Sequence, residues 1–141
     1  MFKLDTEKAV ILIKQAELLA DKIAYPILEP YGLTSSQYKV IKFLYAAPSA
    51  TVCQIDIEEY FSLRNPTVTG ILQNLERNGW IKRKKNPDDG RSKIISVTPK
   101  ALSIKSEIVG LGDKIESTFT KNLSSDEYKQ LIAILKKTLG K

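Results

Sequence analysis

Apolar residues recur at helical spacing over most of the chain. Residues 6 to 25 place apolar side chains at steps of three and four, which predicts a long helix that Pro26 bends or stops. This stripe consists of Ala9, Leu12, Ala16, Leu19, Ile23 and Ile27. Because Ile11 and Ile13 lie beside it, the helix has a second apolar surface, which can be buried inside the monomer or against another subunit.

The segment from Thr34 to Gln37 has the residue types of a capping box, in which the first and last side chains each bond a free backbone N–H. It predicts a helix from residue 35 to about 46, ended by Pro48. The side chains that this helix would bury are Tyr38, Ile41, Leu44 and Tyr45.

Two shorter helices separated by a tight turn follow. Thr51 is predicted to open the first of them, residues 52 to 60, with Ile55 towards the core. The turn lies at residues 62 to 64, so the pair has the order of a helix-turn-helix.

The second helix of this pair is predicted over residues 66 to 78. Asn65 has the side chain of an N-cap, Pro66 suits the first helical position, and Gly79 suits the residue that ends a helix. The apolar stripe of this helix consists of Val68, Ile71, Leu72 and Leu75.

The opposite face of this helix is polar and carries no acidic residue. It presents Pro66, Gly70, Gln73 and Arg77, with Thr69 and Asn74 at its edges. Such side chains can match base-edge donors and acceptors in the major groove of DNA. The alternative is an ordinary solvated helix face.

A β-hairpin is predicted directly after this helix. Residues 80–85 and 93–98 are strand-like, and the turn formers of residues 86–92 lie between them. The hairpin is strongly basic, through Lys82, Arg83, Lys84, Lys85, Arg91 and Lys93. Its loop is therefore expected to form a wing that reaches phosphates or the minor groove.

Two helices complete the chain. Thr98 and Pro99 are predicted to start a long helix to about Lys121, in which Gly110 and Gly112 allow a bend or a close helix contact. Its apolar positions are Ala101, Ile104, Ile108, Leu111, Ile115 and Phe119. A second capping box, residues 124–127, opens a last helix with Tyr128, Leu131, Leu135 and Leu139 on one side.

Positive charge is concentrated in residues 64–105, which include the second helix of the pair and the hairpin. The 141-residue chain has 22 Lys or Arg against 16 Asp or Glu, and residues 64–105 alone carry a net charge of about +7. The remaining residues are close to neutral. A single domain with such a focused basic region indicates a polyanionic partner, nucleic acid before membrane.

With these features, residues 66–98 resemble the winged helix of the multiple antibiotic resistance regulator (MarR) family. The family's wing motif, Asp-x-Arg followed by a hydrophobic residue and Thr, is matched by Asp89-Gly90-Arg91 and by Val97-Thr98. The resemblance covers essentially the whole chain in length and element order. One departure is Gly70, where many members carry a larger, often basic residue.

The resemblance implies a mostly α fold with a small β-hairpin wing. Residues 34–99 would form the winged helix-turn-helix, and residues 1–33 and 100–141 would form the dimerisation helices. It further implies a homodimeric regulator, a ligand-responsive repressor that binds a pseudopalindromic operator. The apolar run of residues 9–13 is too short for a signal peptide, so a cytoplasmic location is expected. The residues expected to contact DNA are Ser62, Arg64, Asn65, Thr67, Thr69, Gln73, Asn74, Arg77, Lys82, Asp89 and Arg91.

At the tip of the wing, the Asp89 carboxylate is expected to hold the Arg91 guanidinium across the Gly90 turn, pointing it towards a narrow minor groove. The alternative is an ordinary turn with a solvated ion pair.

Members of this family commonly bind phenolic, anionic or lipophilic effectors where the dimerisation and winged parts meet. Tyr25, Tyr31 and Tyr38 are candidates to line such a pocket, although tyrosines near a helix junction more often belong to the core.

Other function classes leave weaker signals. Cys53 allows a thiol redox switch, although a lone cysteine is commonly a small buried hydrophobe. A winged helix can also bind proteins, so an interaction module is a further alternative. One cysteine and no histidine argue against a metal site, and no constellation of residues suggests an enzyme or a cofactor.

Overall fold

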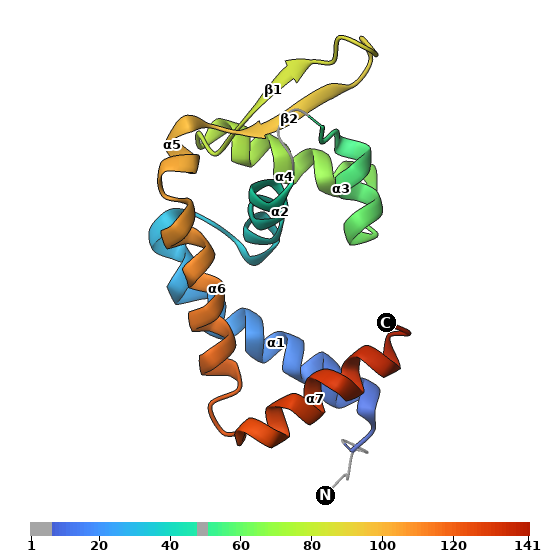
Figure 1. Cartoon of the computed structure of the whole chain (residues 1–141), viewed down its shortest axis with the longest axis vertical. Helices are drawn as coiled ribbons and strands as arrows, with labels where there is room; N and C mark the ends of the chain where they lie inside the picture. Colours follow the sequence, from blue (N-terminus) through green and yellow to red (C-terminus); the bar gives the residue numbers. More distant parts are fainter. Residues whose placement is uncertain (1–6, 48–50) are drawn as a thin grey trace, which may run out of the picture.

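The computed structural model describes residues 7–47 and 51–141, which form helices and one hairpin (Figure 1). The elements in chain order are α1 (Ala9–Leu28), η1 (Glu29–Tyr31), α2 (Ser35–Ala46), α3 (Gln54–Phe61), α4 (Asn65–Arg77), β1 (Ile81–Lys85), β2 (Lys93–Val97), α5 (Pro99–Ser103), α6 (Lys105–Phe119) and α7 (Ser125–Thr138). The predicted fold class, mostly α with a hairpin wing, is therefore confirmed.

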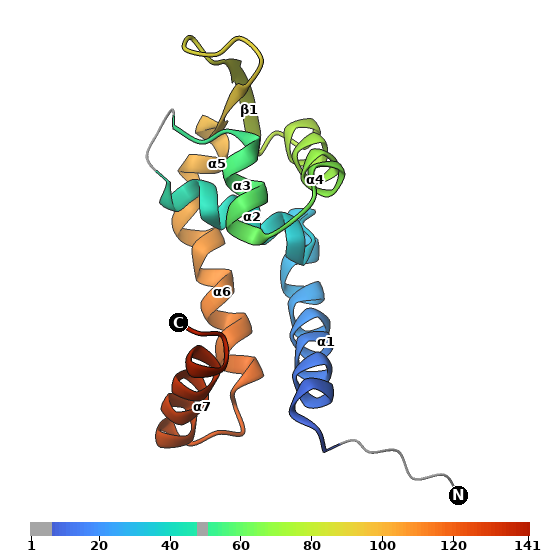
Figure 2. The ribbon, with the colours of Figure 1, turned by 90° about the vertical axis from the view of Figure 1, so that its right-hand side faces the viewer.

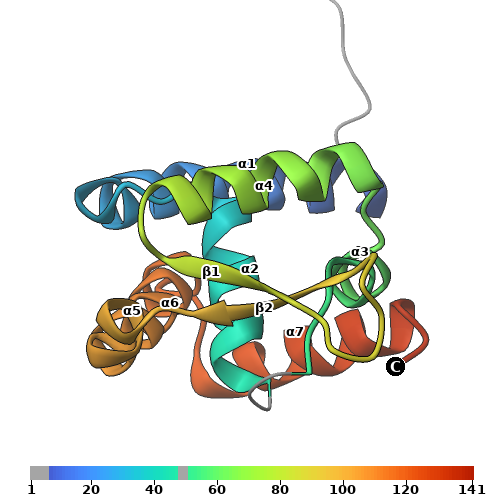
Figure 3. The same cartoon turned by 90° about the horizontal axis from the view of Figure 1, so that it is seen from above.

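The molecule is elongated, with the hairpin at one end and α7 at the other (Figure 1). In the view turned by 90°, α1 and α6 run away from the head formed by α2, α3 and α4, and α7 follows from the far end of α6 (Figure 2). These three helices, α1, α6 and α7, are called the legs below. Seen from above, α4 lies along one side of the head and the hairpin crosses beside it (Figure 3).

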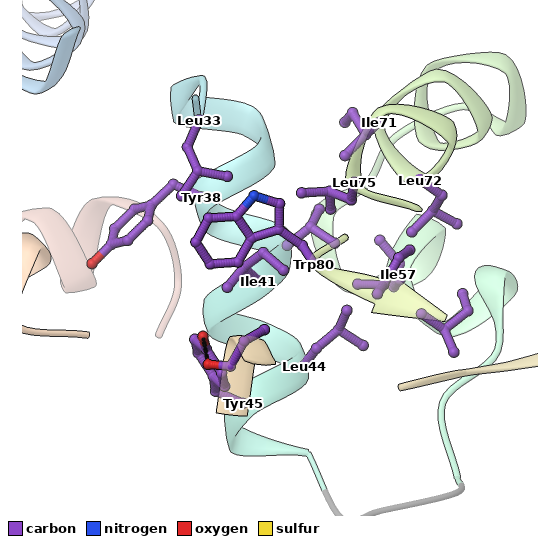
Figure 4. Close-up of a cluster of buried hydrophobic side chains, with 14 of the residues drawn as sticks. Leu33, Tyr38, Ile41, Leu44, Tyr45, Ile57, Ile71, Leu72, Leu75 and Trp80 are labelled. Carbon is purple, nitrogen blue, oxygen red and sulfur yellow. Dashed lines mark hydrogen bonds between the residues drawn. The ribbon is translucent and has the colours of Figure 1, made fainter. Parts of the chain in front are cut away.

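The head has an apolar core to which each of its helices contributes (Figure 4). The apolar faces predicted for α2 and α4 are buried as expected, and Trp80 with Ile81 closes the core from the hairpin side. The most completely buried side chains include Ile41, Ile57, Val68, Leu72 and Leu75. Burial of this kind typically stabilises a fold by roughly 1.5–3 kcal/mol for each such side chain.

Helix α3 starts later than predicted, and a different side chain reaches the core. Val52 is not helical: its carbonyl accepts a hydrogen bond from the Ile95 N–H at 2.8 Å, so this residue extends the pairing of the wing. Helix α3 begins at Gln54, with Cys53 as N-cap. Ile55 is 54% exposed, and Ile57 takes the core position instead.

Helix α1 runs past Pro26, which was predicted to bend or stop it. Ala24 and Leu28 are buried on either side of the proline, so packing favours continuation for another half turn. Gly32, with φ of 69°, ends the following 3-10 turn. The predicted start at residue 6 and the role of Pro48 lie outside the described residues.

The predicted helix from Pro99 to Lys121 is divided in two at Ile104, which has φ of −110° and ψ of 17°. Just before this break, the Ser103 hydroxyl bonds back to the Lys100 carbonyl at 2.6 Å. The predicted close contact is found at Gly112, where a Cβ would lie 3.1 Å from the Tyr38 hydroxyl.

Two buried tyrosines of α2 form hydrogen bonds to α5 and α6. The Tyr38 hydroxyl donates to the Ile108 carbonyl and the Tyr45 hydroxyl donates to the Ala101 carbonyl, both at 2.6 Å. Burial raises the pKa of both hydroxyls, so they remain protonated donors. The two hydroxyls therefore fix α2 relative to α5 and α6.

Candidate nucleic-acid interface

Helix α4 buries one face and leaves the other towards solvent, as its sequence predicts. It begins one residue earlier than expected, at Asn65, with Arg64 as an N-cap that makes no side-chain capping bond. The Asn65 side chain instead donates to Glu58 Oε2 at 3.0 Å. At the other end, Gly79 adopts the expected left-handed conformation, with φ of 78°.

The predicted base-contacting residues lie on the outer side of α4. Thr67 and Gln73 are exposed, whereas Thr69 and Asn74 are half-buried at the edges of this face. The Asn74 Oδ1 accepts a hydrogen bond from the Arg77 guanidinium at 3.1 Å. The face is polar and slightly basic, with a gap at Gly70, where an added Cβ would meet no heavy atom within 4 Å.

The turn between α3 and α4 presents two further predicted residues. Ser62 adopts a left-handed conformation with φ of 53°, which reverses the chain sharply after α3. Arg64 is exposed at the N-terminus of α4, where it is the N-cap residue. A cation beside a helix N-terminus suits a phosphate, because both attract negative charge.

A polar network joins α3 to the edge of α4. The Gln54 amide donates to Thr69 Oγ1 at 2.9 Å, and Glu58 accepts from the Asn65 amide. Gln54 and Glu58 are four residues apart, so they lie on the same side of α3. The two helices of the helix-turn-helix are thus connected through side chains of the candidate interface.

The predicted hairpin forms, and its register places Ile81 opposite Val97 and Lys85 opposite Lys93. Lys82 is exposed on β1, and Asp89 and Arg91 are exposed at the tip. The expected contact between the Asp89 carboxylate and the Arg91 guanidinium does not form. Asp89 Oδ1 instead accepts from the backbone N–H of Arg91 at 3.0 Å, a local turn bond that orders the backbone and leaves the Arg91 side chain exposed.

An ion pair joins the wing to α4. Arg83 on β1 donates to both carboxylate oxygens of Glu76, at 2.8 and 3.3 Å. These bonds hold the pKa of the Glu76 carboxyl below its usual range. The ion pair therefore stabilises the fold at pH values above the usual carboxyl pKa, and this stabilisation is lost as the pH falls through the lowered pKa. Arg83 therefore links the hairpin to α4.

The three candidate effector residues do not meet in one pocket. Tyr38 borders a cavity of about 260 Å³ between α1, α2 and α6, together with Lys39 and Lys42. Tyr31 and Tyr25 border two other cavities, and the Tyr31 hydroxyl donates to Glu107. An effector site stays a prediction.

Cys53 is half-buried between α3 and the wing. Its sulfur lies 3.9 Å from the Asn86 amide nitrogen and 4.0 Å from the Ser92 hydroxyl. Redox sensing through this thiol also stays a prediction.

In the part of the chain that the structure describes, no three His, Cys, Asp or Glu side chains come together as metal ligands. Across the same residues, no helix combines the length and apolar character needed to span a bilayer.

Three residues that support the candidate interface have roles that were not predicted from the sequence: Gln54 and Glu58, and Arg83, which was counted only among the basic residues of the wing. The spacing of Gln54 and Glu58 by four residues on the first helix of the pair was an available signal. Arg83 gave no such signal, because its pairing with Glu76 depends on how the hairpin folds back on α4.

Sequence comparison relates the chain to known regulators. A model of the MarR family matches residues 33–93. The multiple antibiotic resistance protein MarR of Salmonella typhimurium is 30% identical over 129 residues, which cover 91% of this chain and 88% of that protein. The HTH-type transcriptional regulator MgrA of Staphylococcus aureus is 30% identical over 113 residues, covering 80% of this chain and 74% of MgrA.

Structure comparison gives the same relationship. The MepR–DNA complex of S. aureus has a TM-score of 0.85 at 28% identity and covers 94% of this chain and 97% of that chain. A mutant MarR of Escherichia coli complexed with operator DNA has a TM-score of 0.84 at 27% identity, covering 98% of this chain and 99% of that chain.

Proposed function

The chain belongs to the MarR family of transcriptional regulators, and from its basic winged helix-turn-helix we propose that it is a homodimeric repressor that binds a pseudopalindromic operator. The observation that carries this proposal is that the exposed polar face of α4, whose neighbouring acid Glu76 is paired with Arg83, lies beside a basic wing at one end of the molecule (Figure 1). The relatives solved as complexes with DNA, MepR and MarR, support it.

In the proposed complex, α4 enters the major groove. Thr67, Thr69, Gln73 and Asn74 contact bases, while Arg77 and Lys82 bind phosphates. The turn residues Ser62, Arg64 and Asn65 fix the position of the protein on the DNA backbone, and Arg91 reaches the minor groove from the wing, which Asp89 orders.

The legs of the molecule supply the dimer interface in this proposal. Apolar side chains that are exposed in the single chain gather there, at the end away from the wing. They include Val10, Leu12, Ile13, Leu18, Leu19 and Ile134. A group of exposed apolar side chains on neighbouring helices is typical of a subunit interface. A two-fold dimer would place two α4 helices about one DNA turn apart.

The decisive test is fluorescence anisotropy of the protein on DNA from upstream of its own gene and on a scrambled duplex, over a salt series. We expect binding at least about a thousandfold tighter to the upstream DNA, with a steep loss of affinity as salt rises. Equal, salt-sensitive binding to both duplexes would contradict sequence-specific recognition of that DNA. Absence of binding to either would favour a protein-interaction module.

Replacing Arg91 by alanine is expected to weaken operator binding by roughly tenfold, because one guanidinium is lost from each wing. The salt dependence should also become less steep. Thermal unfolding should stay unchanged, since the Arg91 side chain is exposed. Binding is compared at one salt concentration with Lys121→Ala, which removes the same charge at the turn after α6, far from the wing. An unchanged affinity for Arg91→Ala would remove the wing from the interface.

A further inference from the structure

The orientation of the Gln54 amide follows from its partners. Its nitrogen lies 2.9 Å from Thr69 Oγ1 and 3.4 Å from the backbone carbonyl oxygen of Asn65. A carbonyl oxygen can only accept, so the end of the amide that faces it must be the NH2 group. Gln54 therefore donates to the Thr69 hydroxyl, and the hydroxyl accepts.

The Asn65 amide is oriented by the same logic. Its nitrogen donates to Glu58 Oε2 at 3.0 Å, and a carboxylate only accepts. Its oxygen consequently faces Thr69, whose hydroxyl donates to it over a long distance of 3.5 Å. The hydroxyl thus accepts a good hydrogen bond and makes only a weak one with its own proton.

This arrangement determines whether the Thr69 hydroxyl acts mainly as a hydrogen-bond donor or as an acceptor towards a further partner. A hydroxyl that accepts a hydrogen bond becomes a stronger donor and a weaker acceptor, because the two bonds polarise each other. A base acceptor can replace the long contact with Asn65 and receive the polarised proton. A base amine would instead meet an oxygen that already accepts from Gln54 and is therefore a weaker acceptor.

We propose that Gln54 is a positioning residue that makes Thr69 a hydrogen-bond donor to DNA, so that α4 selects a base with a major-groove acceptor at this position. The acceptors are N7 and O6 of guanine, N7 of adenine and O4 of thymine, while cytosine presents only its N4 amine. Guanine against cytosine is therefore the sharpest contrast. This inference rests on the proposed function, since it requires α4 to lie in the major groove.

The substitution Gln54→Glu tests the proposal by reversing the direction of the bond. A glutamate has no proton to donate at neutral pH, so the Thr69 hydroxyl must donate to it and is left as an acceptor. The substitution should not impair folding, because acidic residues are favourable in the first turn of a helix.

The preferred motif of the wild-type protein is first selected from a pool of random duplexes. Thr69→Val, which removes the hydroxyl at nearly constant shape, identifies the base pair concerned as the position where preference is lost. Affinities are then measured for duplexes carrying each of the four bases there. We expect wild type to favour guanine over cytosine by roughly tenfold and Gln54→Glu to abolish or reverse this ratio.

Ile55→Glu is the matched control, because it adds the same charge at the neighbouring, exposed position. It should lower affinity for all four duplexes by the same factor. The proposal is overturned if Gln54→Glu behaves like Ile55→Glu, or if it changes the base ratio equally in a Thr69→Val background. A wild-type protein that selects no motif at all would instead refute the proposed function on which this inference rests.

Discussion

A glutamate in place of Gly70 is expected to abolish specific DNA binding, with affinity falling by at least about a hundredfold, because bringing like charges together costs several kcal/mol. Gly70 lies on the outer side of α4 midway between the ends of the helix, between Thr67 and Gln73. The added carboxylate would stand among base edges and phosphates. The free protein should become more stable, since replacing a glycine inside a helix typically gains about 0.5–1 kcal/mol and no heavy atom lies within 4 Å of the new Cβ.

Gly70→Gln separates charge from size in this experiment. It introduces a side chain of the same length without the charge and should gain the same helix stability. Anisotropy on the operator and thermal unfolding of the free protein are measured for both variants. If Gly70→Glu binds the operator as tightly as Gly70→Gln, the outer face of α4 does not lie against DNA.

The elements that the sequence predicted well are those with local signals. Both capping boxes, at Thr34 and Ser124, form with both of their reciprocal hydrogen bonds, because the partners are only three residues apart. Helix α4 likewise ends just before Gly79, because a glycine adopts the left-handed conformation there whatever its distant neighbours are. The apolar stripes of α2 and α4 are buried because helical periodicity alone decides which side chains share a face.

The errors in the fold come from contacts that are distant in sequence. Val52 was predicted to begin the helix, yet its carbonyl accepts a hydrogen bond from the Ile95 N–H of β2, which holds it in extended backbone and delays α3. The apolar positions on either side of Ile104 continue one stripe, so periodicity gave no indication of the break between α5 and α6. The Ala101 carbonyl, in the last turn before this break, accepts from the Tyr45 hydroxyl of α2, so in both cases a contact distant in sequence outweighs local preference.

The same distinction applies to the candidate interface. Periodicity was sufficient to place Thr69, Gln73 and their neighbours on one side of α4, because that question involves a single helix. The groups that orient these side chains belong to other elements, such as Gln54 on α3 and Arg83 on β1. Spacing along the chain cannot reveal such partners until the helices are placed relative to one another.

The substitution Ile134→Glu on α7 is expected to dissociate the dimer. Ile134 on α7 is 62% exposed in the single chain, and α7 has no fully buried residue of its own. Burying an isoleucine contributes about 1.5–3 kcal/mol, and burying an unpaired carboxylate costs more than that gain. Because a two-fold interface contains each substitution twice, we expect the dissociation constant of the dimer to rise at least about a thousandfold.

Sedimentation equilibrium measures the subunit association, and circular dichroism measures the helix content of the same samples. Lys129→Glu is the control, since Lys129 is exposed on α7 about 140° around the helix from Ile134. The control should remain a dimer that binds a full pseudopalindrome, whereas Ile134→Glu should bind the full site scarcely better than one half of it. A fully dimeric Ile134→Glu would exclude this side of α7 from the interface. A variant that is monomeric and unfolded would show that the legs need the second subunit to stay folded, which also requires α7 to pack across the dimer.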